Sequence, residues 1–531
     1  MFQEEGLSSV TSSPLQFFSM MSLSVSPSLG SPYQMKCEQR GLVLIHLLLA
    51  GANFVATGDL QNANLTLEQI SQHASLDGDT MQRIASYFSE ALADRILKTW
   101  PGIHRALNSS RITMVSDEIL VQKLFFELLP FLKFSYILTN QAIVEAMEGE
   151  KMVHIVDLYG AGPAQWISLL QVLSARPEGP PHLRITGVHH KKEVLDQMAH
   201  KLTEEAEKLD IPFQFNPVLS KLENLDFDKL RVKTGEALAI SSILQLHSLL
   251  ALDEDASRRK SPLLSKNSNA IHLQKGLLMN HNTLGDLLDG YSPSPDSASS
   301  SPAASSSALM NSESFLNALW GLSPKVMVVT EQDFNHNCLT MMERLAEALF
   351  SYAAYFDCLE STVSRASMDR LKLEKMLFGE EIKNIIACEG CERKERHEKM
   401  DRWIQRLDLS GFANVPISYY GMLQGRRFLQ TYGCEGYKMR EECGRVMICW
   451  QERSLFSITA WRPRKIELFS FPQVANPIAP NHEHHFRQFL HYLIRWQRFT
   501  GTAKRTRLGK EKDSAHVCHF MRHWELYEKL D

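Results

Sequence analysis

The residues of this chain that are best placed to do chemistry follow a short apolar run. Residues 152–156 are rich in β-branched side chains, which predicts a parallel strand buried on both faces. Asp157 stands at the carboxyl end of that strand, and Gly160 and Gly162 permit a tight turn with a close backbone approach. In an open α/β sheet this crevice binds ligands, so these three residues are candidates for holding a nucleotide-type cofactor such as S-adenosylmethionine.

The spacing of these residues gives that cofactor site weak support. The pattern is D-x-x-G-x-G rather than G-x-G-x-x-G, and Gln165 occupies the position that would admit a close helix. A ribose-binding carboxylate is expected at the end of the second strand, predicted at 183–188, but basic residues stand there: His189, His190, Lys191 and Lys192. The residues alone therefore favour a strand-turn-helix unit that closes a sheet, and no cofactor is predicted.

A second candidate site has the spacing of metal ligands. Cys388 and Cys391 form a C-x-x-C pair, and His397 follows closely. A structural zinc site normally needs a second pair, and the later cysteines fall in a different predicted region: Cys434, Cys443 and Cys449. Free thiols are therefore the favoured interpretation, and no metal is predicted. No triad or paired-carboxylate spacing is recognisable either, so no catalytic residue is assigned.

Composition excludes some functions for the chain. Its 531 residues are 44% hydrophobic, which is enough for one large or two smaller α/β domains. A net charge of −4 and a pI near 6.6 give no general attraction to phosphate, so direct nucleic-acid binding is not predicted. Nine scattered cysteines fit a reducing compartment, cytosol or nucleus. The apolar stretch 42–56 is shorter than the roughly 20 residues that cross a bilayer and predicts a buried helix.

Three segments differ in composition from the rest. Residues 1–36 are rich in Ser, Met and Pro without a period, which predicts disorder. Residues 255–312 form a Ser/Pro-rich insertion, either a passive linker or a tract for phosphorylation. Residues 464–531 form an atypical extension that ends the chain. Its basic run, 504–512, fits a solvated face or a nuclear-import signal.

The remaining residues predict one α/β domain over 37–463. Residues 37–150 have helical periodicity without strand signals, which predicts a helical cap. Residues 151–463 predict the α/β core, with a βαβ series followed by an antiparallel meander that closes one edge. The expected strands are 152–157, 183–188, 213–218, 236–243, 325–331, 436–439, 445–451 and 455–461. The expected helices of the core are 164–175, 191–209, 244–251, 337–356 and a block at 368–406.

Three leucines in the first helix form an L-x-x-L-L pattern. Leu44, Leu47 and Leu48 lie on one helical face that can dock in a partner's groove, so they are candidates for partner interaction. The alternative, favoured for any single leucine, is that they face the cap's own core.

Polar residues in the core region have similarly plain explanations. His154 alternates with apolar neighbours and is expected to be a hydrogen-bonded core histidine, and Asp157 is expected to bond the following turn. The charged segment 393–398 predicts a solvated helix face on which Lys394 and Glu398 pair at i,i+4.

Several motifs resemble those of the plant GRAS family, in family order over 40–256 and 313–463. The helical region from residue 42 resembles its first leucine-rich region, VHIVD its VHIID motif, and helix 191–209 its second leucine-rich region. Later residues resemble its PFYRE and SAW elements, with Thr459 in place of the usual Ser. The matching residues are Val153, His154, Ile155, Val156, Asp157, Pro324, Tyr355, Phe356, Glu395, Arg396, Trp403, Gly411, Trp450, Thr459, Ala460 and Trp461. The motif wording is most similar to the scarecrow-like three subgroup.

This resemblance implies a fold and a function. The implied fold is a Rossmann-like, methyltransferase-like, mostly parallel sheet with an antiparallel C-terminal edge and an N-terminal helical cap. The implied function is a nuclear co-regulator of transcription that is not an enzyme and docks on zinc-finger DNA-binding factors and other GRAS proteins, including the DELLA type. The subgroup implies a role in gibberellin response, opposing DELLA repressors, and in root development. The alternative from the residues is an S-adenosylmethionine-dependent methyltransferase of small molecules.

Overall fold

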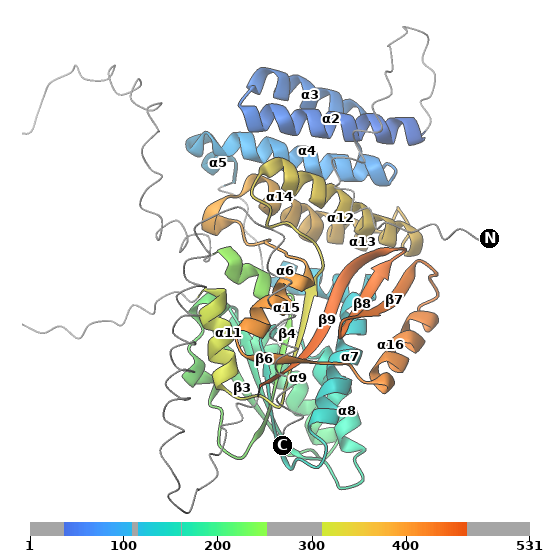
Figure 1. Cartoon of the computed structure of the whole chain (residues 1–531). Coiled ribbons are helices and arrows are strands. Elements are labelled where there is room, and N and C mark those ends of the chain that lie inside the picture. Colours follow the sequence, from blue (N-terminus) through green and yellow to red (C-terminus); the bar gives the residue numbers. More distant parts are fainter. Residues whose placement is uncertain (1–36, 109–114, 161, 252–310, 465–531) are drawn as a thin grey trace, which may run out of the picture. The chain divides into compact units, whose positions relative to one another are not determined.

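The protein is described from a computed structural model covering residues 37–108, 115–160, 162–251 and 311–464 (Figure 1). The expectations for residues 1–36, for the insertion up to residue 310 and for the tail from residue 465 lie outside the described residues. Asn311 and Ser312, assigned to the insertion from sequence, instead cap and begin a helix, since Asn311 accepts a hydrogen bond from Ser314 N.

Among the described residues, six helices precede the first strand: α2 (Cys37–Thr57), α3 (Leu60–His73), α4 (Thr80–Lys98), α5 (Pro101–Asn108), α6 (Val115–Leu128) and α7 (Phe131–Ala146). Side-chain caps determine where two of them begin. Asp59 accepts from Asn62 N at the start of α3, and Asp79 forms a capping box with Gln82 at the start of α4. Both helices therefore begin at an aspartate that accepts a hydrogen bond from a free backbone N–H of the first turn.

A nine-stranded sheet forms the core, in the order β3-β2-β1-β4-β5-β9-β8-β7, with β6 paired to β9. The first five strands are parallel, and β9 runs antiparallel to β5, β6 and β8. This confirms the predicted mostly parallel sheet with an antiparallel C-terminal edge. The strands are β1 (Met152–Asp157), β2 (His182–His189), β3 (Phe213–Leu219), β4 (Ala237–Ile243), β5 (Val326–Gln332), β6 (Phe412–Val415), β7 (Tyr437–Glu442), β8 (Arg445–Trp450) and β9 (Arg453–Pro463).

Helices and short turns join the strands: α8 (Ala164–Ser174), α9 (Lys192–Lys208), η1 (Leu222–Asn224), η2 (Phe227–Leu230), η3 (Leu246–Leu249), α11 (Ser312–Gly321), α12 (Met341–Thr362), α13 (Met368–Leu373), the π-helical η4 (Glu374–Phe378), α14 (Gly379–Ala387), η5 (Gly390–Glu392), α15 (Met400–Leu409) and α16 (Tyr419–Thr431). Three differences from the predicted elements stand out. The helix expected at 244–251 contains the 3₁₀ turn η3, the block 368–406 is broken between α14 and α15, and β6 with α16 was not predicted.

The helical cap combines segments that are far apart in the sequence. Figure 1 shows α2, α3 and α4 stacked above α12 and α14, and α4 packs directly on α14 and α12. Helix α7, in contrast, packs on α8, α16 and the strands β5 and β9. The cap therefore contains α12 and α14 from the second half of the chain, while α7 belongs to the layer that covers the sheet.

The two faces of the sheet carry separate apolar clusters. Along β1, Ile155 belongs to the cluster that includes α7, α8 and the cap, whereas Val156 belongs to a second cluster beneath α11 and α15. Alternate residues of a strand point to opposite faces, so each central strand is buried on both sides. The sheet is thus covered on both faces around the carboxyl end of β1.

The first described helix is longer and more exposed than expected. Helix α2 has 21 residues, and by length and composition its segment Gln39–Thr57 is apolar enough to cross a membrane. It packs against α3, α4 and α12, which accounts for its buried side. Only 28% of the apolar window is buried, so much of its surface faces away from the domain.

Candidate functional site

The carboxylate of Asp157 is used within its own turn. It is 2% exposed, with Oδ2 accepting from Trp166 Nε1 at 2.7 Å and Oδ1 accepting from Tyr159 N at 3.0 Å. Burial raises the pKa of Asp157, and these hydrogen bonds oppose the rise. Both oxygens are therefore occupied by the strand-turn-helix unit, as expected for a structural acid at the end of a buried strand.

The two glycines of this turn have different roles. Gly160 has a φ of 51°, and a Cβ placed there would lie 2.4 Å from the carbonyl oxygen of Val188 on β2. A Cβ on Gly162 would meet nothing within 4 Å. The missing side chain at Gly160 thus lets the turn pass close to the backbone of β2. Gly162, in contrast, borders a separate cavity of about 200 Å³.

Basic residues stand at the end of β2, where a ribose carboxylate would be. Lys191 Nζ lies 2.5 Å from Glu118 Oε2 of α6, and His190 Nε2 lies 3.9 Å from the same oxygen. Burial lowers the pKa of His189 and of His190. A carboxylate does reach this edge, but it comes from α6 and is paired with Lys191.

A buried histidine and glutamate cluster lies at the carboxyl ends of β4 and β5. Glu331, the sixth residue of β5, accepts from the backbone N of Gln245 and Leu246 through Oε1. Its Oε2 lies 2.9 Å from Nδ1 of His247. Although burial lowers the pKa of His247, its bonds to Glu331 and Glu395 outweigh burial and raise the pKa to about 10.

A cavity of about 190 Å³ borders this cluster. Its lining includes His247 and Glu395 together with Tyr159, next to the β1 turn, and Glu381. Burial, then repulsion from Glu395, raises the pKa of Glu381 to about 8, and Tyr352 donates a 2.7 Å hydrogen bond to it. At neutral pH this carboxyl is therefore largely protonated and able to donate a hydrogen bond.

The charged segment 393–398 is a loop, and the prediction of a solvated helix face is wrong. Lys394 Nζ pairs with Glu223 Oε1 at 3.5 Å rather than with Glu398. Asn384 Oδ1 accepts from the backbone N of Lys394 and Glu395, a tertiary contact that helical periodicity does not reveal. Three side chains of the loop are at most 3% exposed: Arg393, Arg396 and His397.

The cysteine pair does not share a site with the histidine that follows it. Cys388 Sγ accepts a 2.9 Å hydrogen bond from Lys98 Nζ, and Cys391 is exposed. His397 Nδ1 instead lies 2.9 Å from Nδ1 of His336. The cluster of potential metal ligands that the described residues do form is His247, Glu395 and His397. Sequence spacing missed His247 and Glu331, although Glu331 ends the strand predicted at 325–331 and His247 comes soon after the strand predicted at 236–243.

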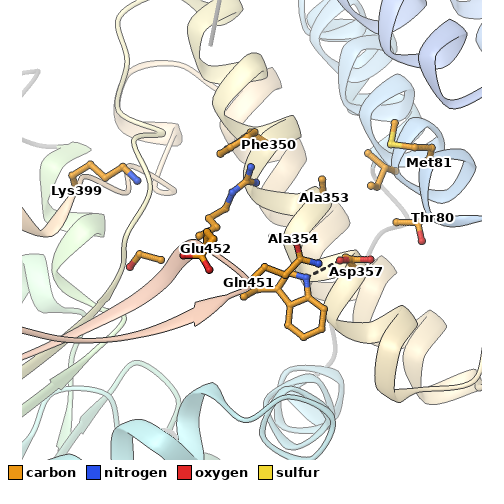
Figure 2. A pocket seen from close by; sticks show the side chains of 13 residues that line it. Thr80, Met81, Phe350, Ala353, Ala354, Asp357, Lys399, Gln451 and Glu452 are labelled. Atoms are coloured by element: carbon orange, nitrogen blue, oxygen red, sulfur yellow. Dashed lines mark hydrogen bonds between the residues drawn. The ribbon is translucent and has the colours of Figure 1, made fainter. Parts of the chain in front are cut away.

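A hollow of about 710 Å³ lies between α4, α12 and the β8–β9 turn (Figure 2). At its edge, Trp450 Nε1 donates a 2.7 Å hydrogen bond to Asp357 Oδ2. Apolar side chains such as Met81 and Phe350 line it beside charged ones such as Glu452. The hollow marks where the cap meets the C-terminal strands.

The L-x-x-L-L leucines face inward. Leu44 and Leu48 are 0% exposed, and Leu47 is half-buried against the same core cluster. This placement fits the alternative in which they form the cap's own core, and it leaves no exposed stripe for docking. The exposed apolar residues of this region are different ones: Leu42, Leu60, Leu65 and Leu76.

Most of the motif residues are structural. Trp403 and Trp461 are at most 1% exposed, and Trp461 Nε1 donates to Thr459 Oγ1 at 2.9 Å. Gly411 has a φ of 87°, and its carbonyl accepts from Trp320 Nε1 at 3.1 Å. The other buried motif residues are Val153, His154, Ile155, Val156, Asp157, Pro324, Tyr355, Phe356, Arg396, Trp450 and Ala460.

The fold and the crevice together define a class. The chain is a Rossmann-like α/β protein with an added helical cap, and the acid of its first βα turn is committed to internal hydrogen bonds. The model of the GRAS domain family matches residues 44–462. The chain belongs to the GRAS domain family.

Several relatives and one solved structure agree with this assignment. The chain is 62% identical to "Scarecrow-like protein 3" of Arabidopsis thaliana, over 88% of this chain and 99% of the relative. It is 49% identical to "GRAS family protein TF80" of Medicago truncatula (82% and 99%) and 30% identical to "DELLA protein RGL1" of Arabidopsis thaliana (81% and 72%). The crystal structure of SCL7 of Oryza sativa superposes with a TM-score of 0.60 at 27% identity, covering 79% of this chain and 99% of that one. The subgroup and the fold class expected from the motifs are thereby confirmed.

Proposed function

We propose that this protein is a nuclear co-regulator of transcription that acts through protein contacts. It docks on DNA-binding factors of the zinc-finger type and on other GRAS proteins, including the DELLA type, and it works in gibberellin signalling, opposing DELLA repressors, and in root development. The support is its membership of the GRAS family and its 62% identity to a scarecrow-like protein over nearly the whole of that relative.

One structural observation carries the docking role, the exposed apolar surface of α2. Its segment Gln39–Thr57 has a mean hydropathy of 1.5, yet only 28% of it is buried. Leu42 is 44% exposed on this helix, and Leu65 is 49% exposed on the neighbouring α3. These exposed leucines lie on two helices that pack against each other, and an apolar helix face fits a groove or helix of a partner. The partner is a DNA-binding factor or a second GRAS chain, giving a homo- or hetero-dimer.

Substitutions of exposed leucines at two different surfaces separate docking from a general effect of the added charges. The double variant Leu42→Asp with Leu65→Asp is expected to weaken binding to a purified DELLA protein and to a zinc-finger factor by about tenfold or more, equivalent to about 1.4 kcal/mol. The matched control is Leu339→Asp with Leu409→Asp, because these leucines are 94% and 86% exposed away from α2 and α3. Equal partner affinity for both folded variants would contradict the assigned docking surface.

Contact with DNA is expected to depend on a partner. The formal net charge of −4 gives no electrostatic term for phosphate contacts. Promoter fragments are therefore expected to be recovered with the protein only when a DNA-binding factor is present. Sequence-specific binding of promoter DNA by the purified chain alone at physiological salt would refute the co-regulator mechanism.

The alternative, an S-adenosylmethionine-dependent methyltransferase of small molecules, has less support. The carboxylate of Asp157 accepts hydrogen bonds from Trp166 and Tyr159. The carboxylate that reaches the end of β2 belongs to Glu118 of α6, and it is paired with Lys191. Calorimetry with millimolar S-adenosylmethionine discriminates the two functions. A ligand at about 100 times its dissociation constant stabilises the folded state by about 2.7 kcal/mol, so binding heat and a raised melting temperature would favour the enzyme.

A further inference from the structure

Three side chains converge at the carboxyl end of β4. His247 follows that strand, and Glu395 and His397 come from the loop before α15. Nε2 of His247 lies 3.4 Å from Oε2 of Glu395, and Nε2 of His397 lies 3.3 Å from the same oxygen. One donor atom from each residue lies within 4.8 Å of the other two.

These separations match the spacing of ligands around a small cation. Zinc binds histidine nitrogen and carboxylate oxygen at about 2.0–2.2 Å, which places neighbouring ligands of a tetrahedron about 3.3–3.5 Å apart. Both nitrogen-to-oxygen distances are in that range or at its lower limit. Two histidines and a glutamate, with one open position, form a recurrent set of zinc ligands.

The ring nitrogen of His247 that faces away from Glu395, Nδ1, makes the hydrogen bond that is usual for a metal-binding histidine. Its Nδ1 lies 2.9 Å from Oε2 of Glu331, and the other oxygen of Glu331 accepts from two backbone N–H groups. A histidine that binds a metal usually donates its second ring N–H to a carboxylate, which orients the ring. Glu331, 1% exposed, therefore aims Nε2 of His247 at Glu395, and an ion bound there displaces the proton that Nε2 shares with Glu395 in the metal-free protein.

A chain of hydrogen bonds determines which ring nitrogen of His397 carries the proton. Ser351 Oγ donates its hydrogen to the carbonyl oxygen of Glu347. It is therefore the acceptor for the N–H of His336 Nε2, which lies 3.1 Å away. Nδ1 of a neutral His336 is then an acceptor, and it takes the N–H of His397 Nδ1 at 2.9 Å. The remaining nitrogen of His397, Nε2, therefore carries a lone pair.

That lone pair faces the carboxylate of Glu395. Nε2 of His397 is buried and has no hydrogen-bond partner among the described residues, although Glu395 Oε2 is only 3.3 Å away. Two acceptors at this distance repel each other unless a cation or a proton lies between them. Buried polar atoms are normally satisfied, so this orphaned nitrogen is a second, independent sign of a ligand.

We propose that His247, Glu395 and His397 bind a Zn²⁺ ion, with a fourth position open to the adjoining cavity. That cavity, of about 190 Å³, is lined by His247 and Glu395. The ion ties the end of β4 to the loop that leads into α15, two segments far apart in the sequence. This site lies in the α/β core, away from the docking surface on α2 and α3, and its role does not depend on the proposed co-regulator function.

Metal analysis of the purified full-length chain tests the site. Untagged protein prepared without chelators is expected to contain about one Zn²⁺ per chain, and removal of the ion by a chelator is expected to lower the melting temperature. Glu395→Gln and His397→Ala are each expected to reduce bound zinc at least tenfold. Glu331→Gln is expected to weaken zinc binding by about 10- to 100-fold, because Glu331 only orients His247.

Two control variants distinguish other zinc-binding groups. Cys388→Ser with Cys391→Ser removes the C-x-x-C pair, and a triple change to Ala removes the tail histidines His482, His484 and His485. Both controls are expected to keep the zinc of the wild type. Retention of zinc by Glu395→Gln together with its loss from either control would overturn the proposed site.

The test does not depend on every variant folding. Glu395 is 23% exposed and Gln has nearly its shape, so Glu395→Gln is the variant expected to keep the native fold. If His397→Ala does not fold, zinc titration of metal-free wild type and Glu395→Gln decides, with Co²⁺ absorption reporting a four-coordinate site. Wild-type protein that carries no zinc and whose melting temperature does not respond to zinc would refute the proposal.

Discussion

At the scale of single residues, a neutral histidine in β1 links stability to pH. His154 is 0% exposed, with Nε2 2.8 Å from Thr186 Oγ1 and Nδ1 3.1 Å from a nitrogen of Arg184. Burial, then the charge of Arg184, lowers the pKa of His154 to about 4. The neutral form is thus favoured in the folded state, so its stabilisation is present above about pH 6.5 and is lost as pH falls toward 4.

This gives a prediction for acid destabilisation. Between pH 7.5 and pH 5 the pKa shift of His154 should remove about 2 kcal/mol of unfolding free energy. Urea unfolding at the two pH values measures that loss. His154→Gln has no titrating ring, so its loss over the same interval is expected to be smaller by about that amount; an equal loss in both proteins would show that other groups cause it.

At the scale of elements, the turn between β1 and α8 depends on one glycine. Gly160→Ala is expected to destabilise the fold by roughly 2–4 kcal/mol, because its φ is positive and its Cβ would meet Val188 O. Gly162→Ala, two residues later, is the matched control and is expected to change stability by less than about 0.5 kcal/mol. Chemical unfolding of both variants checks this, and equal effects would contradict the assigned close approach.

A buried ion cluster joins α4 of the cap to the helical segment α13–η4 that leads into α14. Glu374 of η4 accepts from Arg83 Nε of α4 at 2.8 Å and from Arg370 Nε of α13 at 2.7 Å, and all three side chains are at most 1% exposed. Glu374→Gln leaves the buried guanidinium of Arg83 without its counter-charge and Arg370 with Glu360 alone, and it is expected to cost about 3–5 kcal/mol.

An exposed carboxylate, whose lysine partner also pairs with Glu90, provides the comparison for that change. Glu380 is 60% exposed and lies 2.9 Å from Lys383 Nζ. Glu380→Gln is expected to cost less than about 1 kcal/mol in the same unfolding assay, since exposed ion pairs are screened by water. Similar losses for Glu374→Gln and Glu380→Gln would argue against a strong ion cluster at the cap.

At the scale of the whole molecule, the last strand is central to the sheet. β9 pairs with β5, β6 and β8, so it joins the parallel strands to the antiparallel edge. A chain ending after residue 452 is expected to lose cooperative unfolding. A chain ending after Arg464 keeps every described contact and is expected to melt as the full chain does. Calorimetric melting of both truncations tests this, and a cooperative transition in the shorter one would refute it.

Local periodicity was sufficient to locate most of the elements. The strands expected from apolar, β-branched runs match β1 to β5 to within one residue at each end, because parallel strands buried on both faces have a strong local pattern. Short amphipathic pieces such as β6 and α16 were missed, since four strand residues or one mixed helix carry little periodic signal.

The sequence alone was therefore enough to predict most helices and strands, to find the family motifs, and to show that the cofactor-binding pattern after β1 is weak. Only the tertiary structure decided which side chains meet. It placed Leu44 and Leu48 inside the cap, buried the charged loop 393–398, and brought His397 to His247 across some 150 positions of chain. The physical reason is that burial and side-chain contacts between distant segments follow from packing, whereas the sequence pattern reports only neighbours along one helix or strand.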